Sequence, residues 1–346
     1  MKWKIRLCTV VMALAMAVPA AAFTDTQQHW AAGAISRWSE AKVLAGFEDG
    51  TFRPNDPITR AQMASLLNKI FGWNEKAENH FSDLPDSAWY TDAILRANAA
   101  GVIQGGGGLV RPQDTITRQE AAVMLYRAFG MQPLMTVNAS FSDGEEIASW
   151  AREAVNTMAD EGYIAGMPDG SFAPKGQLTR AQAATILNKV ISQYYDWAGV
   201  YADRTGDFQV VGAPGVTLQN ISAKDLLVSS AARGSETMLS NIDVSDRLMV
   251  GSGDRYTSVH LLGSSKIARL LVTGDNARVH VGEDVQIGEI LISGSNADIR
   301  GLQKGMEVTV TGAGAQVNGH AMEIGTGKAG KDISGSGIDL VFGGSL

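Results

Sequence analysis

A pattern of about sixty residues occurs three times in succession, and this repetition constrains the fold more than any other feature of the chain. Each copy opens with Phe-x-Asp, at 23–25, 81–83 and 141–143, and closes on Thr-Arg-x-Gln or Thr-Arg-x-Glu. Repeats at a fixed period are supersecondary units that bury a continuous core only when neighbours stack. We therefore predict three repeats that enclose a shared core: 23–80, 81–140 and 141–197.

Both halves of each repeat have the apolar periodicity of an α-helix. In the second half of repeat 1 the apolar residues fall at i, i+3, i+4 and i+7: Met63, Leu66, Leu67 and Ile70. Repeats 2 and 3 follow the same plan: Met124, Leu125, Ala128 and Phe129, then Ala183, Ile186, Leu187 and Ile191. A glycine-rich turn separates the halves, and three glycines are predicted to end the first helices: Gly46, Gly105 and Gly166.

The Thr-Arg motif predicts the start of each second helix. Threonine at the N-cap, with glutamine or glutamate three residues later, forms a capping box. The pairs are Thr59 with Gln62, Thr117 with Glu120, and Thr179 with Gln182. Capping does not explain the intervening arginines, because a cation at a helix N-terminus is unfavourable by roughly 0.3–1 kcal/mol.

These arginines, Arg60, Arg118 and Arg180, have two possible uses. A helix N-terminus offers free N–H groups to an anion, and a guanidinium fork beside it matches a carboxylate or phosphate. Alternatively, each arginine pairs with a carboxylate of a neighbouring repeat, with three candidates: Asp25, Asp83 and Asp143. The residue pattern alone leaves both uses open.

Residues 198–346 form a region of a different kind. Short β-rich runs alternate there with Gly, Ser, Asn and Asp, and three similar triplets recur at spacings of 20 and 18 residues: 273–275, 293–295 and 311–313. This period predicts a parallel β-solenoid with coils of about 20 residues, and a β-sandwich of hairpins is the alternative. His260 and His280 would then stack in adjacent coils, about 4.8 Å apart. No carboxylate or cysteine spacing supports a metal there, so no metal site is expected.

Residues 1–22 have the features of a signal peptide: a positively charged start, an apolar run at Leu7–Val18, and small residues at Ala20 and Ala22. An uncleaved anchor is the alternative. The single cysteine, Cys8, lies in this segment, so the exported part would contain no disulfide and no thiolate ligand. The formal net charge of −7, without a dominant basic patch, argues against a nucleic-acid partner.

The Phe-x-Asp opening, the tryptophan, the Asp-Gly-x-Phe-x-Pro turn and the Ile-Thr-Arg-Ala-Gln box together resemble the S-layer homology (SLH) repeat, over residues 23–196. The resemblance implies an all-α, pseudo-threefold bundle with grooves between repeats. It further implies non-covalent anchoring of a bacterial surface protein to a cell-wall glycan, often one with a pyruvate ketal. Box arginines would hold the carboxylate, aspartates would accept sugar hydroxyls, and tryptophans would form a sugar-facing wall. The expected glycan-binding residues are Arg60, Arg118, Arg180, Asp25, Asp83, Asp143, Trp30, Trp89, Trp150, Thr59, Thr117 and Thr179.

Core packing is the alternative role of each tryptophan. The repeats also depart from the SLH pattern in places. Repeat 2 has four glycines, 105–108, where the others have Asp-Gly, so a looser turn and an altered groove are expected. Repeat 3 has Ala173 where the others have Arg53 and Arg111. Three equal sites are therefore not expected.

The resulting hypothesis is an exported protein of the cell wall, cell surface or S-layer. SLH repeats would bind a secondary cell-wall polysaccharide or a peptidoglycan-linked glycan, and the solenoid would serve as a spacer or interaction surface, with self-association in an array as a further option. No cofactor and no enzymatic activity are expected. The alternative is an SLH-anchored, glycan-active enzyme with its active site in the C-terminal domain. Such catalysis needs converging carboxylates, and the scattered acids there show no such pairing: Asp275, Glu283, Asp284 and Asp298.

Overall fold

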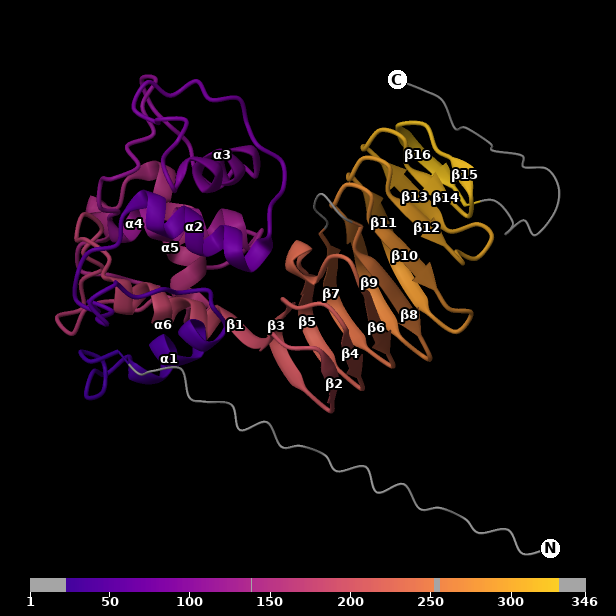
Figure 1. The fold of residues 1–346 in the computed structure, drawn as a ribbon, viewed down its shortest axis with the longest axis horizontal. Helices are drawn as coiled ribbons and strands as arrows, with labels where there is room; N and C mark the ends of the chain where they lie inside the picture. The colour runs from indigo at the N-terminus through magenta and orange to yellow at the C-terminus, as the bar shows by residue number, and fades with distance from the viewer. Residues whose placement is uncertain (1–22, 138, 252–255, 330–346) are drawn as a thin grey trace, which may run out of the picture.

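The computed structural model describes residues 23–137, 139–251 and 256–329, and the predicted signal peptide lies outside these ranges. Within them, a helical bundle precedes a two-sheeted β domain (Figure 1). Each repeat contributes two helices: α1 (Ala32–Glu40) and α2 (Arg60–Phe71), α3 (Thr91–Ala99) and α4 (Arg118–Ala128), α5 (Ser149–Asp160) and α6 (Arg180–Val190). The predicted helix–turn–helix repeats are confirmed.

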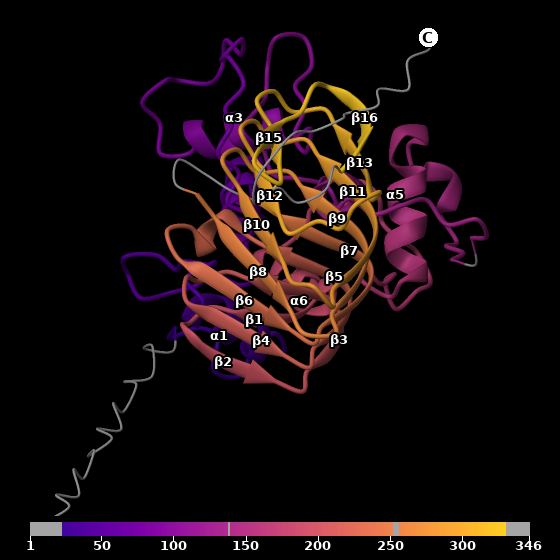
Figure 2. The same cartoon turned by 90° about the vertical axis from the view of Figure 1, so that its right-hand side faces the viewer.

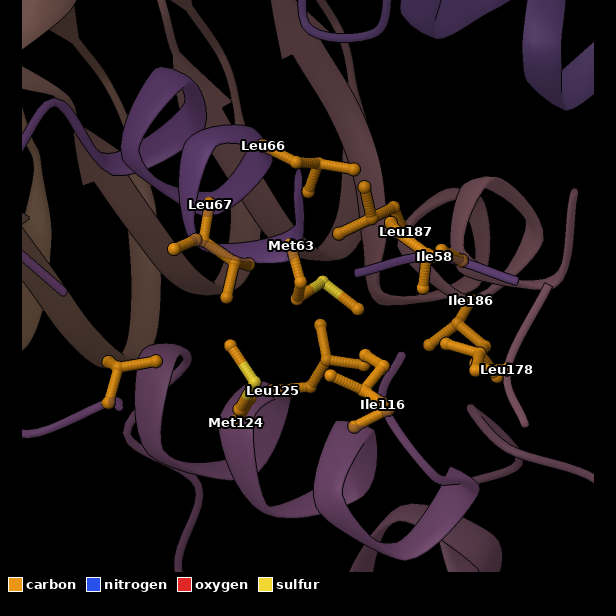
Figure 3. Close-up of a cluster of buried hydrophobic side chains, with 14 of the residues drawn as sticks. Ile58, Met63, Leu66, Leu67, Ile116, Met124, Leu125, Leu178, Ile186 and Leu187 are labelled. Carbon is orange, nitrogen blue, oxygen red and sulfur yellow. The ribbon is translucent and has the colours of Figure 1, made fainter. Parts of the chain in front are cut away.

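The second helices α2, α4 and α6 surround the centre of the bundle. Their apolar faces meet there (Figure 3), with Met63, Leu67 and Leu125 almost fully buried. The residues before the three boxes join in a closed ring of backbone hydrogen bonds: Ile58 N to Leu178 O at 2.9 Å, Leu178 N to Ile116 O at 3.0 Å, and Ile116 N to Ile58 O at 3.0 Å. This ring closes the pseudo-threefold arrangement that a linear stack would leave open.

The prediction that Gly46, Gly105 and Gly166 end the first helices is wrong. Those helices end six residues earlier, and the left-handed residue that follows each is Lys42, Gly101 or Gly162. The three predicted glycines instead make room for the phenylalanine that opens each repeat. A Cβ on Gly46 would lie 2.1 Å from the Phe23 ring, and the other two positions are similarly closed: 2.3 Å at Gly105 from Phe81 and 3.0 Å at Gly166 from Phe141.

The C-terminal domain is a parallel β-solenoid, which confirms the prediction over the sandwich alternative. One described sheet contains, in spatial order, β1 (Ile191–Tyr195), β3 (Thr205–Val211), β5 (Ser222–Val228), β7 (Asp243–Val250), β9 (Lys266–Val272), β11 (Gln286–Ile292), β13 (Glu307–Val310) and β16 (Gly325–Lys328). The other contains β2 (Gly199–Ala202), β4 (Val216–Gln219), β6 (Glu236–Ser240), β8 (Ser258–Leu262), β10 (Arg278–Val281), β12 (Asp298–Arg300), β14 (Gln316–Val317) and β15 (His320–Ala321). The two sheets rise side by side along the coil (Figure 2). Among the described strands, β16 pairs antiparallel with β13 and β15 pairs antiparallel with β14, and the other strand pairs are parallel.

The recurrent triplets lie at a corner where successive coils stack closely. A Cβ on Gly294 would lie 2.1 Å from Gly274 O, so only glycine fits at this contact. The alanines that follow the triplets are fully buried in the coil: Ala277, Ala297 and Ala315. His260 and His280 are in register, and their rings stack with centroids 4.6 Å apart, as predicted. Among the described residues no group of three or more potential ligands could hold a metal ion.

The bundle and the solenoid meet without a linker. Helix α6 ends at Val190 and β1 begins at Ile191, which was expected in the helix and inside the range predicted for repeat 3. Phe208, Val210 and Leu227 of β3 and β5 belong to the bundle's hydrophobic cluster. No described helix combines the length and apolar character needed to cross a bilayer.

A buried arginine of β7 reinforces this junction. Arg247 pairs with Asp225 at 2.7 Å and donates to the carbonyls of Phe129 and Gly130, at the C-terminus of α4. Because a helix C-terminus carries a partial negative charge and unsatisfied carbonyls, a cation there is stabilising. The solenoid therefore holds α4 in place.

Candidate functional site

Each box threonine caps its helix as predicted. Gln62 N donates to Thr59 Oγ1 at 3.2 Å, and Thr59 N donates to Gln62 Oε1 at 3.1 Å. The same reciprocal pair forms at Thr117 with Glu120 and at Thr179 with Gln182. The capping box is confirmed in all three repeats, and it occupies one lone pair of each hydroxyl that was also expected to bind glycan.

The box arginines join each repeat to the next one around the ring. Arg60 donates from Nε to Val110 O and from Nη2 to Gln104 O, at 2.8 and 2.9 Å. The other two arginines do the same one repeat further on: Arg118 to Phe172 O and Ala165 O, and Arg180 to Phe52 O and Ala45 O. We call each such pair of bonds an arginine clasp. The clasp partners are backbone carbonyls. The alternative of a pairing with Asp25, Asp83 or Asp143 is wrong, although Arg60 also forms an ion pair with a carboxylate of the next repeat, Glu120, at 3.6 Å.

Those aspartates hold the turn on which the clasp acts. Asp25 accepts hydrogen bonds from Phe52 N and Arg53 N, at 2.8 and 2.7 Å. Asp83 and Asp143 accept the equivalent pairs of backbone N–H groups. Burial raises the pKa of Asp25, but the two N–H bonds outweigh it and keep that pKa below its ordinary value. Each carboxylate thus supports a turn in which the second N–H donor has a positive φ: Arg53, Arg111 or Ala173.

The tryptophans face solvent. Trp30 and Trp89 are each 66% exposed and Trp150 is 57% exposed, which contradicts the core-packing alternative. Exposed indole faces are costly to leave in water and are suited to stacking on a partner. No described part of the bundle buries these rings.

The environment of the arginine differs among the three repeats. Phe47 and Phe52 lie over the Arg180 guanidinium, with ring centroids 5.0 and 4.3 Å from Cζ, and Arg180 is buried. Arg118 lies 4.8 Å from the Phe172 ring and is also buried. Arg60 remains partly exposed. The position of Phe47 is occupied by Gly106 in repeat 2, so none of the described rings covers Arg60.

The glycine run at 105–108 also leaves a second arginine, Arg111, without a carboxylate partner in its turn. In repeat 1, Asp49 pairs with Arg53 at 2.8 Å, and hydrogen bonds from Thr51 and Arg53 lower the pKa of Asp49 to about 2. Repeat 2 has no aspartate in this turn. Arg111, the counterpart of Arg53, consequently makes no side-chain hydrogen bond or ion pair with any described residue.

These differences leave a groove of about 370 Å³ beside Arg60. Its lining includes Gly105, Gly106 and six charged or aromatic side chains, and we call it the Arg60 groove: Arg60, Arg111, Asp114, Glu120, Arg127 and Trp150. The groove therefore combines an arginine of repeat 1, the turn and helix α4 of repeat 2, and the tryptophan of repeat 3. Of these six side chains, only Arg60 and Trp150 were predicted to bind glycan. Nothing in the sequence indicated that residues of three different repeats would meet in one groove.

Charge in the Arg60 groove is arranged around Nη1, the guanidinium nitrogen that Arg60 does not use in the clasp and that pairs with Glu120. Arg60 Nη1 lies 3.6 Å from Glu120 Oε1, whereas Glu120 Oε2 is held by Thr117 N at 2.8 Å. Burial lowers the pKa of Arg60, and the Glu120 carboxylate opposes that shift. With Arg111 and Arg127 at its sides, the groove can receive an anionic group, and the Trp150 ring can receive the flat face of a sugar.

Comparison with known proteins agrees with the repeat pattern. The family model described as S-layer homology domain matches residues 22–64, 80–122 and 140–184. The chain is 36% identical over 170 residues to Exoglucanase XynX of Acetivibrio thermocellus, covering 48% of this chain and 16% of that protein. It is 26% identical over 284 residues to an S-layer protein of Bacillus thuringiensis subsp. finitimus, covering 78% of this chain and 34% of that protein.

A third relative is the Cellulosome-anchoring protein of Acetivibrio thermocellus, 29% identical over 163 residues, with 44% of this chain and 36% of that protein covered. The chain thus spans about a third or less of each of these relatives. The matched family and the S-layer and anchoring relatives point to a location outside the cell, at the cell wall or surface. The bundle of this chain therefore consists of three S-layer homology repeats, followed by a parallel β-solenoid.

Proposed function

We propose that this chain anchors a surface protein non-covalently to an anionic cell-wall glycan, and that the Arg60 groove is its principal binding site. The observation that carries the proposal is the coincidence of three cations with one exposed tryptophan in a single open groove. SLH domains are wall anchors, and relatives named as S-layer and anchoring proteins support that use here.

The groove chemistry favours a sugar with a carboxylate, such as a pyruvate ketal. A carboxylate accepts two parallel hydrogen bonds from a guanidinium, which an uncharged hydroxyl does not. Arg111 is unpaired among the described residues, and Nη1 of Arg60 has only its 3.6 Å ion pair with Glu120. The sugar ring would then lie on Trp150, with Asp114 and Glu120 as acceptors for its hydroxyls.

The grooves at Arg118 and Arg180 serve mainly as clasps in this proposal, because aromatic rings cover those guanidinium groups. Asp25, Asp83 and Asp143 contribute through the turns that they hold, and Trp30 and Trp89 remain proposed sugar contacts at the other two grooves. Any weak binding there would add to the first site by multivalency.

The solenoid serves as a rigid spacer in this account. It is joined to the bundle by a shared core and by Arg247, so it projects in a fixed direction. We do not assign it an enzymatic role. Relatives with enzyme names match about half of this chain and a small part of their own length, in keeping with SLH repeats as the anchor of those enzymes.

Sedimentation of residues 23–346 with purified cell walls tests this proposal. The shorter fragment 23–196 is unsuitable because it separates β1 from its partner β3. Arg111→Gln should weaken binding about tenfold, since it removes an unpaired cation without touching a clasp. Arg53→Gln is the matched control, because Arg53 is already paired with Asp49. Mild acid removal of ketal pyruvate should abolish the difference between the two variants. Equal binding of Arg111→Gln and Arg53→Gln would contradict the proposal.

A further inference from the structure

A second cavity lies between the bundle and the solenoid. It has a volume of about 530 Å³ and lies between the α3 side of the bundle and the strands β5, β7 and β9, with Ser293 just after β11. In Figure 1 the two domains meet at β1 and β3 and diverge toward α3 and β11. We call this cavity the interdomain cleft.

The bundle side of the cleft presents a fixed aromatic ring. Trp73 stacks on Phe71 with centroids 5.1 Å apart and planes within 4°. Arg96 Nη1 donates to the carbonyls of Trp73 and Asn74, at 2.8 and 2.7 Å. The segment that carries the ring is therefore held in place, and the ring lines the cavity.

The solenoid side combines an apolar ladder with a hydroxyl edge. Leu227, Met249 and Leu271 are in register on successive coils. Beyond them, the exposed Thr273 and Ser293 occupy equivalent positions on adjacent coils. Pyranose rings have apolar faces and hydroxyl edges, so a surface with both features fits a carbohydrate chain.

Arg127 connects this cleft with the Arg60 groove. Its side chain, in the last turn of α4, lines both cavities and is exposed. It makes no side-chain hydrogen bond or ion pair with a described residue, whereas Arg96 and Arg247 in the same cleft already bind backbone carbonyls. The equivalent residues of the other box helices, Lys69 and Lys189, line neither cavity.

We propose that a bound glycan chain continues from the Arg60 groove past Arg127 into the interdomain cleft, where further sugar units contact Trp73 and the Thr273–Ser293 edge. This inference rests on the proposed function, and it assigns the solenoid a direct part in binding. Arg127 holds an anionic substituent between the two cavities. The carboxylates of Glu75 and Asp275, which line the cleft, accept hydrogen bonds from sugar hydroxyls.

Glycan fragments of two lengths test the inference by calorimetry on residues 23–346. A short fragment of the pyruvylated polymer fills only the groove, and a longer one reaches the cleft. Ser293→Glu places a negative charge at the cleft, so it should weaken the longer fragment about fivefold and leave the short one unchanged. Ser293→Gln controls for side-chain size. Gln219→Glu adds the same charge on the opposite sheet, where Gln219 is exposed and outside both cavities.

The outcomes separate the two proposals. Tighter binding of the longer fragment to the wild type, lost only in Ser293→Glu, supports the inference. Equal affinities of Ser293→Glu and Gln219→Glu for the longer fragment overturn the inference about the interdomain cleft and leave the proposed function of the Arg60 groove unaffected. Failure of the wild type to bind either fragment overturns the inference together with the proposed function.

Discussion

Replacement of Arg118 by methionine should destabilise the bundle strongly, because the clasp is a buried, charge-assisted contact. Arg118 is 5% exposed and donates to Phe172 O and Ala165 O at 2.7 and 2.6 Å. Hydrogen bonds to charged groups contribute about 1.5–3 kcal/mol each, and their loss leaves two carbonyls without a partner. Methionine keeps part of the apolar stem, so we expect a loss of about 3–5 kcal/mol. That is a large share of the roughly 5–15 kcal/mol typical of a domain.

Urea unfolding followed by tryptophan fluorescence measures this loss. With a slope of about 2–3 kcal/mol per molar urea, the midpoint should fall by more than about 1 M at an unchanged slope. Arg118→Lys should recover little of it, since an ammonium group lacks the planar fork that reaches both carbonyls. A midpoint of Arg118→Met within about 0.2 M of the wild type would refute the clasp as a structural contact.

Three further predictions concern other parts of the chain. The double variant Phe47→Gly/Phe52→Val has the residue types of repeat 2 and removes both rings over Arg180, so calorimetry with glycan should show a higher stoichiometry. An unchanged stoichiometry would mean that the rings do not block that groove. Arg247→Met leaves the Asp225 carboxylate buried without its partner, so it should lower the free energy of unfolding by about 3–5 kcal/mol. Thermal unfolding should then split into two transitions. A single transition at the original temperature would contradict the role of Arg247 in joining the two domains. Burial and the neighbouring imidazole lower the pKa of His280. The unfolded chain then binds this proton more readily, so stability should fall as the pH drops below about 6.5, and His280→Gln should reduce that fall. Identical pH dependence of the melting temperature in both proteins would exclude this contribution.

Most of the fold could be predicted from the periodicity of the sequence. The helical spacing of Met63 to Ile70, the reciprocal capping residues and the 20-residue coil all follow from local pattern, and these three features form as predicted. The end of α6 was harder to place, because Ile191 continues the apolar spacing of the helix although it begins β1. A residue that satisfies both periods is assigned only by its tertiary partner, here Phe208 of β3.

The site was less predictable, because its residues come from three repeats. Arg60 meets the turn of repeat 2 and Trp150 of repeat 3 only after the bundle closes into a ring. Every residue has a backbone carbonyl, so the sequence does not indicate which carbonyls accept hydrogen bonds from an arginine. The sequence alone therefore could not distinguish the clasp from an ion pair with a carboxylate. The glycine run at 105–108 was the available signal for an altered groove. Its consequence, an uncovered Arg60 and an unpaired Arg111, depends on the neighbours that the structure supplies.

The most direct test of the open groove is the affinity of Gly106→Phe for pyruvylated cell-wall glycan, measured by calorimetry. Gly106 has an ordinary backbone conformation, and an added Cβ would meet no heavy atom within 4 Å. The variant should therefore fold with an unchanged urea midpoint while its ring covers Arg60, as Phe47 covers Arg180. Gly106→Ala, whose methyl group is too short to reach the guanidinium, is the control. We predict binding at least about tenfold weaker in Gly106→Phe and unchanged in Gly106→Ala. Wild-type affinity in a folded Gly106→Phe would contradict the assignment of the Arg60 groove as the glycan site.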